Sequence, residues 1–170
     1  MTEVISPDNK ELLTYVLGNI HNTLYIDVVR DLKQQTEQKL ESGELDPADF
    51  PITHYFAPGV YSRQMDAKAG TFCISKMHRT EHLNVLLKGA LTIITEDGLK
   101  YLEAPQVIKS RAGTMRIGYF HQDTSWLTIH PTNETDLEAI ERDVIVPEHE
   151  IEEFLASIGH TPKEIALCLG

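Results

Sequence analysis

The chain has 170 residues, enough for one compact domain with a hydrophobic core. Its net charge of −11 argues against a nucleic-acid polymer as partner, because phosphate binding needs clustered lysine and arginine. No apolar run is long enough to span a bilayer, and the first residues lack the basic and apolar regions of a secretory signal. We therefore expect no membrane partner. The two cysteines, Cys73 and Cys168, are far apart, which predicts reduced thiols and a cytoplasmic location.

Residues 1–50 are predicted to form a helical extension. Apolar residues such as Leu12 and Val16 recur at helical spacing within residues 8–42. A break near Gly18 is expected to separate two helices.

Residues 51–132 are predicted to form an antiparallel β-barrel. Short runs rich in β-branched and aromatic residues are broken by turn signals. Among these, Asp97-Gly98 is a strong hairpin signal between Ala90–Thr95 and Leu99–Glu103. About eight strands at this spacing favour a sandwich or barrel over a parallel α/β sheet.

Residues 133–170 are predicted to form a second helical extension. We expect Thr135 to cap a helix over 137–144, and another helix to begin near Pro147 and end at Gly159. The expected fold is therefore mainly β, a barrel with helices before and after it in one compact domain.

The chemistry concentrates in one stretch of the predicted barrel. There Gly70, Lys76, His78, His82 and Gly89 follow a glycine, five residues, His-x-His, three or four residues, glutamate, six residues, glycine spacing. This is the first motif of the cupin superfamily, which the sequence resembles. The resemblance implies a cupin-type jelly-roll barrel. Lys76 replaces the first motif histidine, and His82 replaces the glutamate.

The second cupin motif aligns with the run from Arg111 through Gly113 to Arg116. The phrases from His78 to Asn84 and from Trp126 to Pro131 also resemble cupin-like proteins of tailed bacteriophages and prophages. That likeness bears on fold and source more than on function.

The resemblance implies a metal site of three histidines and one carboxylate, for which Zn, Fe, Mn or Ni would be suitable. Lys76 and Arg116 occupy two of the four implied ligand positions, and neither side chain ligates a metal. We therefore expect no cofactor at the usual position. A divalent metal held by His78 and His82 with His121 or Glu81 stays open as an alternative.

The same substitutions predict a receptor for a small anionic molecule. Lys76, His78, His82 and Arg116 place hydrogen-bond donors in one cavity, and the arginine fork fits a carboxylate or phosphate. Tyr119 and Trp126 are candidate surfaces on which a base or ring could stack. A nucleotide, a sugar phosphate or a carboxylate is the expected ligand.

Simpler roles compete with these. His78 and His82 could hydrogen-bond each other in a turn. Arg116 could pair with Glu81, Glu103 or Asp123. His130, before Pro131, is expected only to end the barrel, and His54 to lie on the surface.

Three functions follow from these residues. The first is ligand binding, including sequestration of a host signalling nucleotide. The second is an enzyme, metal-dependent or using histidine as acid and base, acting as an isomerase, oxygenase or phosphodiesterase. The third is a virion or assembly scaffold. Sheet-edge pairing, common among small cupins, further predicts a homodimer or a larger homo-oligomer.

Overall fold

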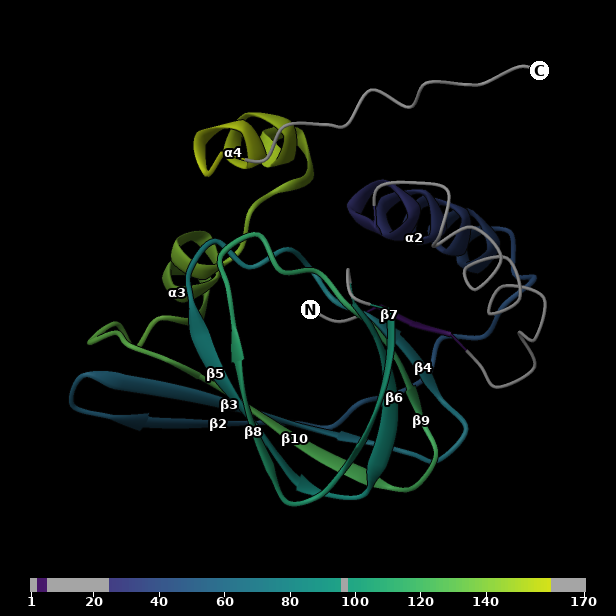
Figure 1. The fold of residues 1–170 in the computed structure, drawn as a ribbon, viewed down its shortest axis with the longest axis horizontal. Coiled ribbons are helices and arrows are strands. Elements are labelled where there is room, and N and C mark those ends of the chain that lie inside the picture. The colour runs from purple at the N-terminus through teal and green to yellow at the C-terminus, as the bar shows by residue number, and fades with distance from the viewer. Residues whose placement is uncertain (1–2, 6–24, 96–97, 160–170) are drawn as a thin grey trace.

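The computed structural model describes residues 3–5, 25–95 and 98–159. Two five-stranded antiparallel sheets face each other, with helices at one end and on one side (Figure 1). The first sheet has the order β1 (Glu3–Ile5), β4 (Phe72–Ile74), β9 (Ile117–Phe120), β6 (Ala90–Thr95) and β7 (Gly98–Glu103). The second has the order β2 (Ile52–Ala57), β3 (Val60–Ala67), β10 (Thr124–His130), β5 (His82–Lys88) and β8 (Gln106–Ser110).

The eight strands from β3 to β10 have the connectivity of a jelly roll. Successive strands alternate between the sheets except at the β6–β7 hairpin, which gives the orders β3-β10-β5-β8 and β4-β9-β6-β7. This double Greek key is the barrel architecture found in cupins. The predicted fold class is confirmed.

Side chains alternate between the inside and outside of the barrel, as the strand pleat requires. The buried interior positions form an apolar cluster with these members: Met65, Ala67, Cys73, Leu86, Leu91, Ile93 and Phe120. These residues form the apolar core of the barrel.

The helix α2 (Tyr25–Glu41) covers the outer face of the first sheet. Val29 and Leu32 are fully buried there, one helical turn apart, against Ile74 and Ile117 of the sheet. Burying each such side chain contributes about 1.5–3 kcal/mol. α2 is thereby fixed to the side of the barrel.

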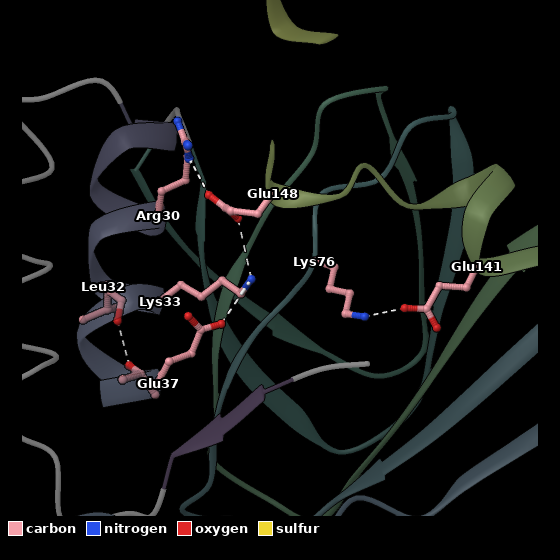
Figure 2. A network of polar contacts seen from close by, with 8 residues as sticks. Arg30, Leu32, Lys33, Glu37, Lys76, Glu141 and Glu148 are labelled. Atoms are coloured by element: carbon pink, nitrogen blue, oxygen red, sulfur yellow. Dashed lines mark hydrogen bonds and ion pairs between the residues drawn. The ribbon is translucent and has the colours of Figure 1, made fainter. Parts of the chain in front are cut away.

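Ion pairs connect α2 to the C-terminal segment. Arg30 Nε lies 3.0 Å from a carboxylate oxygen of Glu148, and Lys33 Nζ lies 3.7 Å from the other oxygen (Figure 2). Glu148 begins the 3-10 helix η1 (Glu148–Glu150), which leads into α4 (Ile151–Ser157). Ile151 of α4 packs into the same core as α2.

The helix α3 (Leu137–Val144) lies at one end of the barrel (Figure 1). Its N-cap is Asp136, whose carboxylate accepts from the backbone N–H of Ala139 at 3.2 Å. The expected cap, Thr135, is therefore wrong by one residue. The longer carboxylate at 136 reaches the first free N–H groups of the helix.

The other predicted elements compare as follows. The hairpin strands are confirmed, since β6 pairs antiparallel with β7, although residues 96–97 of its turn lie outside the described residues. The helix expected after Pro147 is confirmed as η1 and α4. Of the N-terminal helical region, α2 is confirmed, and the residues before 25 lie outside the description, apart from β1. Within the described chain, no helix is long and apolar enough to cross a membrane.

Candidate functional site

The barrel interior holds a cavity of about 290 Å³. Its inner part is apolar and includes Leu91, Ile93 and Phe120. At its mouth, α3 contributes Ile140 and Val144. The polar groups are gathered between these two regions.

Three histidines meet in this polar zone: His78, His82 and His130, hereafter the histidine trio. The ring centroids of His78 and His82 lie 4.1 Å apart, those of His82 and His130 4.9 Å, and those of His78 and His130 5.5 Å. One nitrogen from each ring falls in a set whose members lie within 4.8 Å of one another. The structure thus gathers one residue from a loop and two from different strands.

Backbone hydrogen bonds fix the loop that carries His78. The backbone N–H of His78 donates to the carbonyl of Thr114 at 3.0 Å, and the carbonyl of His78 accepts from the N–H of Gly113 at 2.8 Å. The carbonyl of Met77 accepts from the N–H of Val146, which follows α3. His82 begins β5, His130 ends β10, and both line the cavity. The trio therefore sits on rigid backbone.

The nitrogens of the trio differ in their partners. His82 Nδ1 lies 2.9 Å from the carbonyl of Thr80, which can only accept, so the neutral ring carries its proton on Nδ1 and a lone pair on Nε2. The Nδ1 atoms of His78 and His130 are buried and have no hydrogen-bond partner. His78 and His82 do not hydrogen-bond each other in the described structure; their rings stack instead. Unpaired buried ring nitrogens are costly unless a ligand occupies them.

Burial keeps the trio uncharged. It lowers the pKa of His78 well below the usual range, with smaller contributions from His82 and His130. It lowers the pKa of His130 to about 4, and lowers that of His82 against the opposing effect of the Thr80 carbonyl. At neutral pH the trio therefore presents neutral imidazoles.

Two arginines line the same cavity, Arg63 on β3 and Arg116 just before β9. Neither forms an ion pair with a carboxylate of the described residues: Glu81 pairs with Lys109, and Asp123 with Lys68. Burial lowers the pKa of both guanidinium groups from its ordinary value. Both guanidinium groups are thus partly buried and outside ion-pair distance of the described carboxylates, and Glu141 acts on Arg63 only at longer range.

A hydrogen-bond chain orients Arg116. Its Nη1 donates to Ser110 Oγ at 2.7 Å, and Ser110 Oγ accepts from the amide of Asn84 at 2.7 Å. The amide oxygen of Asn84 accepts from Trp126 Nε1 at 3.0 Å and from Thr128 Oγ1 at 3.1 Å. Asn84 and Ser110 are fully enclosed, so this chain holds the guanidinium in one place.

Lys76 has a different role from the arginines. Its ammonium pairs with the carboxylate of Glu141 on α3 (Figure 2). Both residues belong to the lining of the cavity. The hydrogen bond from Lys76 is the main cause that lowers the pKa of Glu141. Glu141 is the one carboxylate among the cavity-lining residues, so the lining carries three cations and one anion, a formal excess of two positive charges.

The residues proposed from sequence divide into two groups. Five line the cavity: Lys76, His78, His82, Arg116 and Trp126. Tyr119 and His121 flank the inward-facing Phe120, and neither of them lines the cavity. Tyr119 packs against the core under α2, and His121 Nε2 lies 2.6 Å from Thr92 Oγ1 on an exposed surface. His121 is therefore separated from the trio.

Sequence reasoning missed Arg63 and the place of His130 in the site, whereas His54 is exposed, as expected, although it also lines the cavity. His54 Nδ1 lies 2.8 Å from the hydroxyl of Tyr61, and the ring of Tyr61 stacks on His130 with centroids 6.3 Å apart. Strand alternation could have found His130, because it lies four positions after Trp126 on the same strand and therefore points to the same face. His130 does end β10, but its side chain is buried in the cavity.

The four ligand positions implied by the cupin resemblance do not fit a metal. Lys76 and Arg116 stand at two of them, and both are cations without a ligating lone pair. His130, which belongs to neither motif, supplies a third imidazole instead. A donor set of three neutral imidazoles suits a first-row transition metal.

No family model matches the chain, and no curated protein matches it. Solved structures that it resembles include a cupin-2 domain protein from Shewanella frigidimarina, 12% identical over 54% of this chain and 90% of that one, with a TM-score of 0.42. The EutQ protein of Clostridium difficile is 13% identical over 50% and 70%, with a TM-score of 0.42. A cupin superfamily protein from Desulfitobacterium hafniense is 12% identical over 50% and 79%, with a TM-score of 0.42. The jelly-roll assignment rests on the strand order described above.

Proposed function

We propose that the protein is a cupin-type binding protein that holds a small anionic molecule in the barrel cavity, between Arg63 and Arg116. The observation that carries this proposal is the pair of enclosed guanidinium groups with no carboxylate partner among the described residues. The chain has a net charge of −11, yet no carboxylate of the described residues lies within ion-pair distance of either guanidinium group. A bound carboxylate or phosphate would supply the missing charge, and its attraction is strengthened by the low dielectric of the cavity.

The size of the cavity narrows the ligand. About 290 Å³ is at the lower end of the range for small-molecule sites, roughly 300–1,000 Å³. A small dicarboxylate or a monosaccharide phosphate matches this volume better than a nucleotide. Trp126, whose indole is held by Asn84, offers an apolar face for the uncharged part of the ligand. Sequestration of a signalling nucleotide, and kinship with bacteriophage proteins, rest on the sequence likeness alone.

Calorimetry against sugar phosphates, dicarboxylates, nucleotides and inorganic phosphate tests the proposal. We expect saturable binding of at least one member and a loss of about 10–100-fold in Arg116→Ala, since a hydrogen bond to a charged group contributes about 1.5–3 kcal/mol. Lys109→Ala is the matched control, because it removes a cation that pairs with Glu81 outside the cavity. An equal loss in both variants, or no binding of any member, would refute the proposal.

An enzyme is the second candidate, and Tyr61 favours it. The hydroxyl of Tyr61 contacts His54, and its ring stacks on His130, so an ionisable hydroxyl lies beside neutral imidazoles. Recovery of the ligand after denaturation separates the two candidates: a bound ligand returns intact, whereas a substrate is changed. The third candidate, a virion or assembly scaffold, requires neither arginine. High copy number in purified particles would favour it.

A further inference from the structure

We infer that His78, His82 and His130 form a binding site for one divalent first-row transition metal ion, which keeps two of the ligand positions that the cupin motifs imply and takes its third ligand from outside both motifs. Two of those positions hold Lys76 and Arg116, and the third imidazole comes from β10 instead. Metal binding at the histidine trio does not require the anion proposed above, so experiments can refute either proposal without refuting the other.

The geometry of the trio carries this inference. A metal bonded to imidazole nitrogens at about 2.0–2.1 Å holds them within about 4.2 Å of one another. One nitrogen of each ring already lies within 4.8 Å of the other two, so small rotations of the rings complete the site. The rings come from backbone that is fixed by strand pairing and by the bonds of His78 to Thr114 and Gly113.

The polar partners of the rings point the same way. Metal-ligating histidines usually donate their second ring N–H to a carbonyl or carboxylate, which orients the ring. His82 makes this contact with the Thr80 carbonyl, which leaves Nε2 for the metal. His78 and His130 each keep a buried Nδ1 without a partner, where a metal would remove the cost of an unpaired nitrogen.

The donor set also selects the kind of ion. The trio offers neutral nitrogen, and the one carboxylate of the cavity, Glu141, is paired with Lys76. Imidazole suits Zn²⁺, Cu²⁺, Ni²⁺, Fe²⁺ and Co²⁺, whereas Mg²⁺ and Ca²⁺ require oxygen ligands. We therefore expect Zn²⁺ and Co²⁺ to bind and Mg²⁺ to fail.

The nearby arginines oppose the metal charge when no anion is present. Arg63 and Arg116 already act electrostatically on His78, so a divalent ion adds to an excess of positive charge. An anion bound between the arginines would relieve this repulsion. Metal and anion should therefore raise each other's affinity by the same factor.

The full chain, stripped with chelator and dialysed, is titrated with Zn²⁺, Co²⁺ and Mg²⁺ in a non-coordinating buffer. We expect one Zn²⁺ or Co²⁺ per chain by calorimetry and elemental analysis, visible absorption bands of nitrogen-ligated Co²⁺, and no Mg²⁺ uptake. His130→Ala and His78→Gln should each weaken Zn²⁺ binding by more than about 100-fold, because losing even the partner behind a ligand costs about 10–100-fold. His121→Ala should bind as wild type, since its ring lies on an exposed surface outside the cavity.

Three results would overturn the inference. Folded wild type that takes up neither Zn²⁺ nor Co²⁺ shows that the stacked rings only pack together. Loss of binding in His121→Ala, with retention in His130→Ala, assigns the ion to another site. Uptake of more than one ion per chain, undiminished in His78→Gln, indicates surface chelation. Because the titration needs no anion, and the calorimetric anion panel needs no metal, failure of one proposal leaves the other intact.

Discussion

The imidazole of His130 lies nearly parallel to that of His78, with an angle of 11° between the ring planes, although the two residues are distant in sequence. His130 ends β10, and His78 sits in the loop before β5. β10 pairs with both β3 and β5, so its side chains share one inner face with Arg63 and Asn84. The polar zone of the cavity is thus a product of strand pairing.

The histidine trio predicts a stability that depends on pH. In the folded metal-free chain the pKa of each trio histidine lies below the unfolded value of about 6.5. The unfolded chain therefore binds more protons as the pH falls below about 6.5, and the free energy of unfolding decreases until the folded pKa is reached, about 4 for His130. Each histidine that stays neutral contributes a slope of up to about 1.4 kcal/mol per pH unit.

Urea unfolding in chelator at pH 7.5, 6.5 and 5.5 measures this slope. His130→Gln should reduce the slope of the free energy of unfolding against pH by the contribution of one histidine. His121→Gln should keep the wild-type slope. Identical slopes in wild type and His130→Gln would show that His130 does not stay neutral in the fold.

Asn84 is predicted to be the polar group on which the barrel interior depends most. Replacing it by Ala leaves Trp126 Nε1 and Thr128 Oγ1 without their acceptor and removes one of the two donors to Ser110 Oγ. Each unsatisfied buried group costs about 1–3 kcal/mol, so we expect a loss of about 2–5 kcal/mol in urea unfolding. Asn133→Ala is the control, because this exposed amide accepts one bond, from the Gly59 N–H, and should cost less than about 1 kcal/mol. Equal costs would contradict the network.

The Lys76–Glu141 pair is predicted to control exchange at the cavity mouth more than stability. Both side chains are partly exposed, and such pairs contribute about 0–1 kcal/mol. Glu141→Gln should therefore leave the unfolding midpoint nearly unchanged while increasing hydrogen exchange of α3 and speeding ligand dissociation. Glu138→Gln on the same helix, which has no ion pair among the described residues, is the control. An unchanged rate of amide hydrogen exchange in α3 of Glu141→Gln would mean that the pair does not hold α3 in place.

Gly89 is predicted to be intolerant of any side chain. Its φ is +87°, and an added Cβ would lie 2.5 Å from the carbonyl oxygen of Asp123 and from Thr124 Oγ1. Gly59 has a similar φ of +78° but open space around its Cα. Gly59→Ala should cost about 1–2 kcal/mol for its left-handed backbone alone, and Gly89→Ala should cost clearly more. Similar unfolding midpoints for the two variants would contradict the close approach of β5 and β10 at Gly89.

The sequence predicted the barrel because turn signals and short β-rich runs are local. It predicted His78 and His82 because motif spacing is also local. It missed Arg63 and His130, which lie on strands without a motif and reach the cavity through pairing between distant segments. Tyr119 was chosen by residue type, whereas the inward position next to it belongs to Phe120, and the pleat decides which of two neighbours faces the cavity. The ion pair of Lys76 required a helix that folds back over the barrel, which no spacing in the barrel sequence indicates.

A crystal structure of the protein with the tightest anion from the calorimetric panel tests the central claim most directly. The account predicts that the anion lies in the barrel cavity with oxygens within hydrogen-bond distance, about 3 Å, of both Arg63 and Arg116. An anion bound outside the barrel, with the two guanidinium groups unchanged, would contradict the claim that this cavity is the functional site.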